Sequence, residues 1–347
     1  MSSSELRDYL QNYDGPEIRI MEVCGTHTHE IFRQGIRNFL SPKINLISGP
    51  GCPVCVTPAS YIDEAIYLAL EKNVTITSFG DLIRVPGTSS SLQKARAEGA
   101  KVKVVYSPID GEKYAKEHPD EQVVFLSVGF ETTTPSDVIA VRNAIRDGIG
   151  NFSILTANKT MPGAYEAMAD STDCYLYPGH VHAIIGTGIC KDLQKRGVSG
   201  VIAGFTGEEL LTALAIAVRK HSEGGPFYVN AYPRVVTDEG SPAAVKLVDE
   251  FTRPCDAMWR GIGMIPGSGV ELKEEYSSYD ARKKFDIPVL EKEYKTACRC
   301  GDVLQGKIRP TGCPLFGKAC NPDHPVGACM VSDEGACSAF YTYGGSL

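Results

Sequence analysis

The sequence predicts an α/β protein with two parallel-sheet units and a cysteine-rich C-terminal segment. Short apolar segments alternate with longer segments whose apolar residues repeat at helical spacing, from about residue 17 to residue 235. Several of the short segments run directly into glycine-containing loops, as the strands of parallel sheets do in open α/β folds. Six of the twelve cysteines then fall between Cys298 and Cys337. The repeated strand, loop and helix units predict the sheets, and the cysteines indicate a different kind of unit at the C-terminal end.

Length and composition allow several folded domains but give no sign of a nucleic-acid surface. The chain has 347 residues, of which 43% are hydrophobic and 22% charged, so it can bury the cores of two or three domains. The pattern along the chain predicts α/β domains at 1–120 and 121–235 and a cysteine-rich domain at 236–347. A net charge of −7 argues against nucleic acid and against anionic membranes as partners.

The cysteine content indicates chemistry in a reducing compartment. The N-terminal residues carry charges where a signal peptide has an apolar core, and no apolar run reaches the length of a membrane span. We therefore expect a cytoplasmic protein that does not enter a membrane. In the cytoplasm, twelve cysteines favour metal binding and thiol redox chemistry over structural disulfides.

The first predicted domain carries a cysteine motif after each of its first two strands. Its pattern predicts helices at 2–12, 30–40, 61–71, 89–97 and 111–117, and strands at 17–23, 44–47, 74–79 and 101–106. The first strand leads into CGTHTH at 24–29, and the second leads into GPGCPVC at 49–55. Loops that follow parallel strands lie at the carboxyl edge of the sheet, where ligands bind in open α/β folds. Cys24 is therefore predicted to lie at that edge.

Cys24 is a candidate nucleophile or soft-metal ligand. A thiol just before a helix is near the positive end of the helix dipole, and a neighbouring imidazole also favours the thiolate. His27 and His29 are the candidate neighbours. For a single cysteine considered alone, the alternative is a small buried packing residue beside two surface histidines.

Cys52 and Cys55 form a Cys-x-x-Cys motif that predicts a dithiol/disulfide switch. Two thiols at this spacing can reach disulfide geometry, and a proline between them is common in thioredoxin-like redox turns. Half of a zinc site is the alternative. The sequence has no second pair where a closed zinc site would require one, so the switch is favoured.

The second predicted domain repeats the pattern with weaker site signals. Strands are predicted at 122–128, 152–156 and 198–203, and helices at 136–146 and from about 207 to 219. Glu131 and the threonines after it could bind a phosphate or carboxylate at a helix N-terminus, although no complete nucleotide-binding fingerprint is present. His180 and His182 would point the same way on a strand but diverge on a helix, and we do not favour them as metal ligands.

The region before the tail is expected to be mainly structural. A helix is predicted at 243–251, and the glycine-rich segment 259–269, which contains the only tryptophan, is predicted to be an interdomain connection. Cys174, Cys190 and Cys255 occur singly, so we interpret them as buried packing residues.

The spacing of the six tail cysteines favours an iron–sulfur cluster. Four thiolates satisfy one tetrahedral zinc or one cubane cluster, which leaves two cysteines to form a disulfide or to stay free. Zinc sites usually use Cys-x2-Cys pairs, which the tail lacks, whereas irregular spacing suits a loop wrapped around a four-iron cluster. A tail held only by disulfides is the alternative, and spacing alone leaves open which four cysteines would bind a cluster.

Several motifs in one order resemble the HypD family of hydrogenase maturation factors over essentially the whole chain. They are CGTHTH at 24–29, GPGCPVC at 49–55, GFETTTP at 129–135, WRG at 259–261 and the six-cysteine tail. The resemblance implies two Rossmann-like α/β domains and a C-terminal [4Fe-4S] domain. It also implies a scaffold that, with the small partner HypC, holds the iron on which the Fe(CN)2CO group of [NiFe]-hydrogenase is built. Cyanide would come from HypE, and the hydrogenase large subunit would be served indirectly.

The resemblance also implies roles for individual residues. Cys24 would bind iron together with a HypC thiolate, His27 would be the histidine needed beside it, and Cys52 and Cys55 would be the redox-active pair. The tail is similar to ferredoxin–thioredoxin reductase, where a disulfide lies next to a four-iron cluster. This similarity implies Cys300 and Cys329 as the disulfide, and as cluster ligands Cys298, Cys313, Cys320 and Cys337. His182 and Gly207 depart from the family pattern, outside its main motifs.

Two function classes follow from these residues. The first is a redox-active scaffold for metallocofactor assembly, which is not a conventional turnover enzyme and in which the [4Fe-4S] cluster supplies electrons. The alternative is a cluster-dependent thiol-disulfide oxidoreductase acting on protein disulfides, which would have no need of Cys24 and its histidines. A purely structural zinc protein is a third class, and it predicts a colourless preparation.

Overall fold

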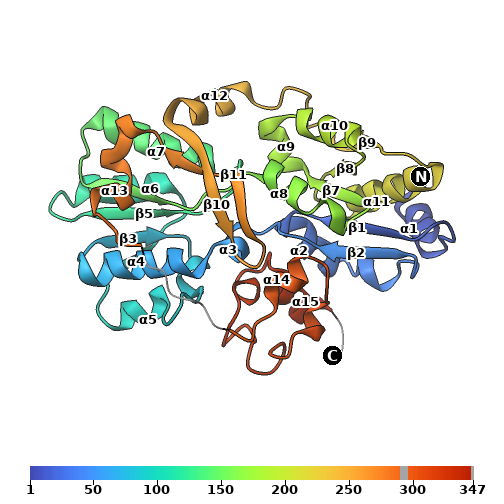
Figure 1. Cartoon of the computed structure of the whole chain (residues 1–347), viewed down its shortest axis with the longest axis horizontal. Helices are drawn as coiled ribbons and strands as arrows, with labels where there is room; N and C mark the ends of the chain where they lie inside the picture. Colours follow the sequence, from blue (N-terminus) through green and yellow to red (C-terminus); the bar gives the residue numbers. More distant parts are fainter. Residues whose placement is uncertain (290–295, 345–347) are drawn as a thin grey trace.

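Two parallel β-sheets lie side by side, and the C-terminal segment lies below the middle of the molecule in the view of Figure 1. The computed structural model describes residues 1–289 and 296–344. The first sheet has the strand order β2-β1-β7-β8-β9, and the second has β4-β3-β5-β6. Neighbouring strands are parallel in both sheets, so the predicted α/β class with parallel sheets is confirmed. The strands are β1 (Ile18–Glu22), β2 (Ile44–Ser48), β3 (Thr75–Ser78), β4 (Val102–Val104), β5 (Val123–Ser127), β6 (Phe152–Thr156), β7 (Cys174–Pro178), β8 (Ser199–Ala203) and β9 (Tyr228–Asn230).

Helices connect the strands and cover the sheets. Among the residues that the structure describes, none of them is long and apolar enough to cross a bilayer. The helices before the tail are α1 (Ser3–Gln11), α2 (Gly25–Arg33), α3 (Pro53–Val56), α4 (Ala59–Glu71), α5 (Leu92–Ala97), α6 (Pro108–Glu117), α7 (Thr134–Asp147), α8 (Met161–Ala167), α9 (Gly179–Ile185), α10 (Gly188–Lys195), α11 (Gly207–Glu223), α12 (Pro242–Phe251) and α13 (Ala281–Lys284). Short 3-10 turns are η1 (Ile36–Asn38), η2 (Leu82–Arg84), η3 (Ala169–Ser171) and η4 (Glu274–Tyr279).

Local sequence signals explain where these helices begin and end. At the start of α11, the Thr206 hydroxyl accepts a hydrogen bond from the Glu209 N–H at 3.2 Å, and the Glu209 carboxylate accepts one from the Thr206 N–H at 3.0 Å. This reciprocal capping box satisfies two N–H groups that have no partner inside the helix. Helix α7 ends at Asp147 and is followed by the capping residue Gly148, whose φ of 68° is easily reached only without a side chain.

The two sheets do not follow the order of the chain. Strands β1 and β2 pair with β7, β8 and β9 in the first sheet, whereas β3 and β4 pair with β5 and β6 in the second. The domain boundary expected near residue 120 therefore falls inside the second sheet, between β4 and β5. Strand β7 (Cys174–Pro178) lies next to β1 in the centre of the first sheet and was not predicted. Periodicity identifies a strand but does not identify its neighbours in the sheet.

The segment predicted to be a glycine-rich connection is instead part of a long hairpin. Strands β10 (Thr252–Trp259) and β11 (Gly263–Leu272) are antiparallel, and in Figure 1 they run between the two sheets toward the C-terminal segment. The side chain of Trp259 is fully buried, where its indole N–H donates to the Ser268 hydroxyl at 2.8 Å. Gly261 and Gly263 have positive φ angles, so these glycines form the tight turn of a structural element.

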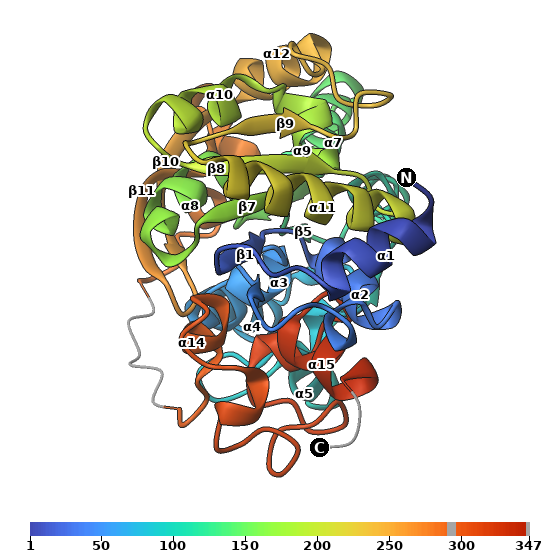
Figure 2. The same cartoon turned by 90° about the vertical axis from the view of Figure 1, so that its right-hand side faces the viewer.

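The C-terminal segment has little regular structure and packs on the helices that follow β1 and β2. Figure 2 shows α14 and α15 beneath α2 and α3. Phe340 contacts Phe32 of α2 edge to face, with ring centroids 5.6 Å apart. A Cβ on Gly301 would lie 2.5 Å from the Gly261 carbonyl oxygen, so the segment also touches the hairpin turn directly. Its elements are α14 (Cys300–Leu304), η5 (Pro310–Gly312), η6 (Ala328–Met330) and α15 (Ala336–Tyr343).

Candidate functional site

The CGTHTH and GPGCPVC loops lie in contact because they follow adjacent parallel strands. Strand β1 pairs with β2 in register from Ile18 with Ile44 to Glu22 with Ser48, so both chains leave the sheet at the same edge. The Gly25 N–H then donates to the Gly51 carbonyl at 2.9 Å. The predicted place of Cys24 at the carboxyl edge of a parallel sheet is confirmed.

Gly51 is required where these two loops meet. A Cβ at this position would lie 2.1 Å from the Cys24 backbone nitrogen and 2.4 Å from its Cα, and backbone atoms cannot move aside as a flexible side chain can. We expect Gly51→Ala to lower the free energy of unfolding by about 3 kcal/mol, or to prevent folding, because it overpacks a buried contact. Gly150→Ala is the matched control, since a Cβ there meets nothing within 4 Å. Anaerobic chemical denaturation of both variants tests this, and equal midpoints would contradict it.

Cys24 lies just before α2, which begins at Gly25, earlier than the helix predicted at 30–40. Burial raises the pKa of its thiol to about 12, more than the backbone N–H groups of His27 and Thr26 lower it. The helix N-terminus alone therefore does not make the thiolate the favoured form, contrary to the expectation for Cys24. A soft metal ion would displace this proton, because the thiolate is the form that binds metal.

The two histidines of the motif have different surroundings. His27 is fully buried, and burial lowers its pKa to about 4, so its imidazole is neutral. Neither of its ring nitrogens makes a well-formed hydrogen bond with the described residues, although the backbone of Ala203 and Gly204 lies near enough to raise the pKa slightly. His29 instead reaches the Asp333 carbonyl, with its Nδ1 3.2 Å from that oxygen. Of the two histidines, His27 is therefore the buried one whose ring nitrogens could still bond to a ligand.

The aromatic ring of Phe205 packs against His27 at the same edge of the sheet. Phe205, which follows β8, has its ring centroid 4.9 Å from that of His27 and 3.7 Å from that of His180. His180 and His182 lie on helix α9 and therefore diverge, so they do not form one ligand pair. His182 is buried, and its ring nitrogens lie 3.6 and 3.7 Å from the Cys190 sulfur.

The tail contributes a carboxylate beside Cys24 that the sequence did not reveal. Glu334 accepts a hydrogen bond from the Thr26 hydroxyl at 2.7 Å. A Cβ on Gly25 would lie 2.5 Å from the Glu334 Cβ, so the glycine allows the two segments to approach. Burial raises the pKa of Glu334 above its ordinary value. The only sequence signal for Glu334 was its position near Cys337.

The Cys52 and Cys55 thiols lie together at the first turn of α3. Cys52 precedes the helix, and the Cys55 N–H donates to its sulfur at 3.2 Å. Burial, followed by hydrogen bonds with the thiols of Cys329 and Cys52, raises the pKa of Cys55 well above its ordinary value. The Cys55 thiol also points to the Ala328 carbonyl, 3.9 Å away. This motif therefore contacts the tail through Cys55.

All six tail cysteines line one small cavity together with Phe316, Gly327 and Met330. Gly327 is needed there, because a Cβ on it would lie 2.6 Å from the Cys298 sulfur. Among the described residues, no three His, Cys, Asp or Glu side chains are grouped around one point as ligands of a single metal ion would be. Soft thiols spread around a largely apolar cavity fit an iron–sulfur cluster, in which each iron takes its own thiolate.

The thiols form a continuous row from the Cys-x-x-Cys motif to this cavity. Cys55 is hydrogen-bonded to Cys52 on one side and to Cys329 on the other, Cys329 is bonded in turn to Cys300, and Cys300 to Cys298. These five thiols come from two segments more than two hundred residues apart. Cys300 and Cys329, which the family resemblance implied as a disulfide pair, are neighbours.

The remaining predicted positions lie outside this row. Cys174 and Cys190 are buried as expected, whereas Cys255 is only half-buried. Glu131 is buried, and its carboxylate accepts a hydrogen bond from the Met161 N–H at 2.8 Å. The hydroxyls of Thr133 and Thr134 both donate to the Phe130 carbonyl, at 3.1 and 3.0 Å, so they serve the loop itself.

Comparisons with known proteins give a matching family and several relatives. The family model HypD, described as "Hydrogenase formation hypA family", matches residues 3–344. The hydrogenase maturation factor HypD of Rhodobacter capsulatus is 40% identical over 339 residues, which cover 95% of this chain and 90% of that protein. HypD of Escherichia coli is 41% identical over 335 residues, covering 94% and 89%, respectively. A putative hydrogenase expression/formation protein of Methanocaldococcus jannaschii is 39% identical over 337 residues, covering 94% and 92%.

The match therefore extends over nearly the full length of these relatives and includes both cysteine motifs and the tail. The chain belongs to the HypD family of hydrogenase maturation factors.

Proposed function

We propose that this chain is the scaffold on which the Fe(CN)2CO group of [NiFe]-hydrogenase is assembled, with HypC as the partner that shares the iron and HypE as the cyanide donor. The observation that carries this proposal is the convergence of Cys24, the Cys52–Cys55 motif and the tail thiols at one edge of the first sheet. A soft metal ligand beside a row of redox-active thiols suits the assembly and reduction of an iron complex.

The iron would be bound as cargo by the Cys24 thiolate and a HypC thiolate. A thiolate suits low-spin iron that carries CO and cyanide, because both the metal and the sulfur are soft. His27 lies in α2, three residues after Cys24, which caps this helix. Its neutral imidazole could hydrogen-bond to a ligand of the iron or to the iron complex. The Glu334 carboxylate raises the pKa of Cys24 and would hold the loop around it through Thr26.

A [4Fe-4S] cluster would be held by Cys298, Cys313, Cys320 and Cys337. When bound, it would supply electrons one at a time to the neighbouring sulfurs. The two remaining tail cysteines, Cys300 and Cys329, would then form the disulfide of the tail. Of these two, Cys329 faces Cys55, so it is the one that can exchange with the Cys52–Cys55 pair.

The exchange needs no atom from outside the row. The Cys329 thiolate would attack the Cys55 sulfur of a Cys52–Cys55 disulfide, and Cys52 would leave and take a proton. Cys300 would then attack Cys329, so that the tail pair becomes a disulfide and Cys55 is released as a thiol. Two electrons would pass from the tail to the Cys-x-x-Cys motif. A thiol-disulfide oxidoreductase would use the same row, but it gives no reason for Glu334 to lie against Thr26, two residues after Cys24.

One preparation tests this proposal. The chain is co-produced with HypC and HypE and purified without oxygen. We expect a brown complex with infrared bands of iron-bound CO and cyanide, and about four irons and four sulfides per chain beyond the cargo iron. Stoichiometric zinc would exclude the cluster, and a brown complex that lacks both kinds of band would favour the oxidoreductase alternative.

A further inference from the structure

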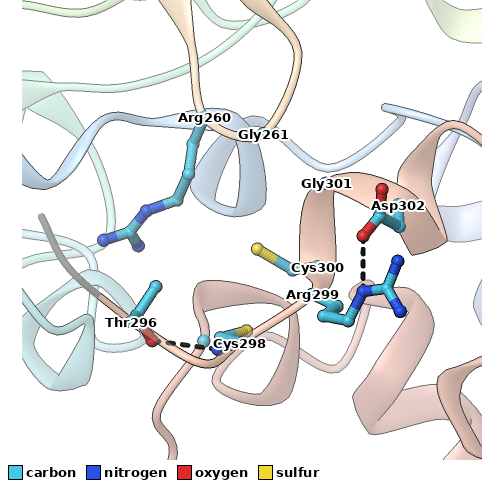
Figure 3. A pocket seen from close by; sticks show the side chains of 9 residues that line it. Arg260, Gly261, Thr296, Cys298, Arg299, Cys300, Gly301 and Asp302 are labelled. Atoms are coloured by element: carbon cyan, nitrogen blue, oxygen red, sulfur yellow. Dashed lines mark hydrogen bonds and ion pairs between the residues drawn. The ribbon is translucent and has the colours of Figure 1, made fainter. Parts of the chain in front are cut away.

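The tail borders a groove that is larger than the pocket beside the thiol row. That pocket encloses about 230 Å3 at the hairpin turn and is lined by Cys298 and Cys300, so it belongs to the site already described (Figure 3). The groove encloses about 680 Å3 between strand β2 and residues 303–310 of the tail. This volume is enough for a short peptide segment, because binding sites for molecules of that size enclose roughly 300–1,000 Å3.

One wall of the groove is an edge of the first sheet. Strand β2 is the last strand on its side of this sheet and pairs with β1. The Gly49 N–H, just after β2, donates to the Glu22 carbonyl of β1 at 2.8 Å. Main-chain groups of successive residues point to opposite sides of a strand, so those of Leu46 and Ser48 point away from β1. Both residues line the groove.

This edge of β2 is covered in part by Arg37. The guanidinium of Arg37 donates to the Leu46 carbonyl at 2.6 Å and pairs with the Glu22 carboxylate at 2.6 Å. Within the part of the chain that the structure describes, the N–H groups of Leu46 and Ser48 have no hydrogen-bond acceptor. Unpaired N–H groups on an edge strand are a template for another strand, so the groove offers two donors to the carbonyls of an added segment.

Two cations of the tail line the groove without a partner. Lys307 and Arg309 are exposed, and no carboxylate in residues 1–289 or 296–344 forms an ion pair with either of them. Arg37, the third cation of the lining, is already paired with Glu22. The whole chain has a net charge of −7, so a preference for an acidic ligand would come from the groove itself and not from general attraction.

Lys307 stands at the end of the groove that leads to the cysteine motifs. A Cβ on Gly306, directly before Lys307, would lie 2.6 Å from the Ile47 side chain near the end of β2. Glu17, the acid of the lining, instead precedes Ile18, which pairs with the first residue of β2. A negative group is therefore favoured alongside the end of β2, which continues into GPGCPVC.

We propose that this groove binds an extended acidic segment of a partner protein, which adds to β2 as a further strand and places carboxylates against Lys307 and Arg309. Carbonyls of the segment accept hydrogen bonds from the N–H groups of Leu46 and Ser48. The bound segment lies beside the strand that leads to Cys52, so it anchors the partner next to the site. The proposal needs neither iron nor a cluster and is therefore independent of the proposed function.

The probe for this groove is an eight-residue peptide that alternates glutamate and valine and carries a fluorescent label. Its binding to the full chain is followed by fluorescence anisotropy without oxygen. We expect it to bind about tenfold more tightly than the same peptide with lysine in place of glutamate, because the unpaired charges of the groove are positive. Added salt should narrow this difference. Equal binding of the two peptides would overturn the proposal.

The two cations are tested by charge reversal. Lys307→Glu and Arg309→Glu should each weaken binding of the acidic peptide about tenfold, since an attraction is replaced by a repulsion. Lys318→Glu is the matched control, because Lys318 is an exposed cation of the tail that does not line the groove. The control should bind as the parent chain does. An equal loss in all three variants would mean that the overall charge, and not the groove, attracts the peptide.

Strand addition is tested with two further peptides, one N-methylated at every valine and the other at every glutamate. We expect one to lose binding and the other to keep it, because only one edge of an added strand faces β2. Equal affinities would exclude strand addition. A dimer of the chain that Lys307→Glu dissociates would mean that a second copy fills the groove, and binding only by a chain that ends at Gly344 would mean that residues 345–347 fill it. Either result would overturn the assignment to a partner.

Discussion

Cys24→Ser is expected to abolish the CO and cyanide infrared bands of the complex with HypC and to abolish hydrogenase maturation. A serine hydroxyl is a much poorer ligand for low-spin iron than a thiolate, because it is hard and stays protonated. The substitution should not damage the fold. Cys24 stands at the N-cap position of α2, and serine is among the best residues for that position.

The controls separate loss of iron from loss of structure. In Cys24→Ser, the iron and sulfide of the tail and the redox behaviour of Cys52 and Cys55 should remain as in the parent chain. Cys255→Ser makes the same chemical change at a half-buried cysteine of the hairpin, away from the thiol row, and should keep the bands. A Cys24→Ser chain that co-purifies with HypC and shows normal bands would mean that the iron is held elsewhere.

The contact between the two loops that carry the cysteine motifs could be predicted from the sequence. It depends on two strands that follow each other along the chain. Strands β1 and β2 are short, apolar and consecutive, and each is followed directly by its motif. Consecutive strands joined by a helix are commonly adjacent and parallel, so the loops after them meet. The contact of Gly25 with Gly51 is the result.

Long-range packing could not be predicted in the same way. Strand β7 ends in a proline and lacks a distinctive pattern, yet it is central because β1 is paired with it. The hairpin strands contain several glycines, which suggested a connection, but the burial of Trp259 decides their structure. Each case is settled by partners distant in the sequence, which propensity does not record.

The same limit applies within the site. Spacing predicted cluster ligands in the tail, but it gave no information on where the tail would dock. Glu334 reaches Thr26 and Ala328 reaches Cys55 only because the tail folds back over about three hundred residues of chain. The carboxylate of Glu334 near Cys24 and the thiol row are both products of this docking.

Cys329 is the tail thiol of the row that lies next to the Cys-x-x-Cys motif. Its thiol is hydrogen-bonded to Cys300 in the tail and to Cys55 in the Cys-x-x-Cys motif. Gly335 is needed to hold it, since a Cβ there would lie 2.2 Å from the Cys329 carbonyl oxygen. No other tail thiol is bonded to Cys55 among the contacts that raise its pKa, which come first from burial and then from Cys329 and Cys52.

Cys329→Ser is therefore expected to stop the transfer of electrons from the reduced tail to a Cys52–Cys55 disulfide. A hydroxyl cannot attack a disulfide under these conditions or form one, so both exchange steps are lost, while the four proposed cluster ligands remain. The cluster is reduced by light and a flavin mediator without oxygen, and the Cys52 and Cys55 thiols are counted by mass-tagged alkylation. Cys190→Ser, a change at a buried cysteine outside the row, should behave like the parent chain. If Cys52 and Cys55 are reduced as fast in Cys329→Ser as in that control, electrons reach them by another route and the row has no role in the transfer.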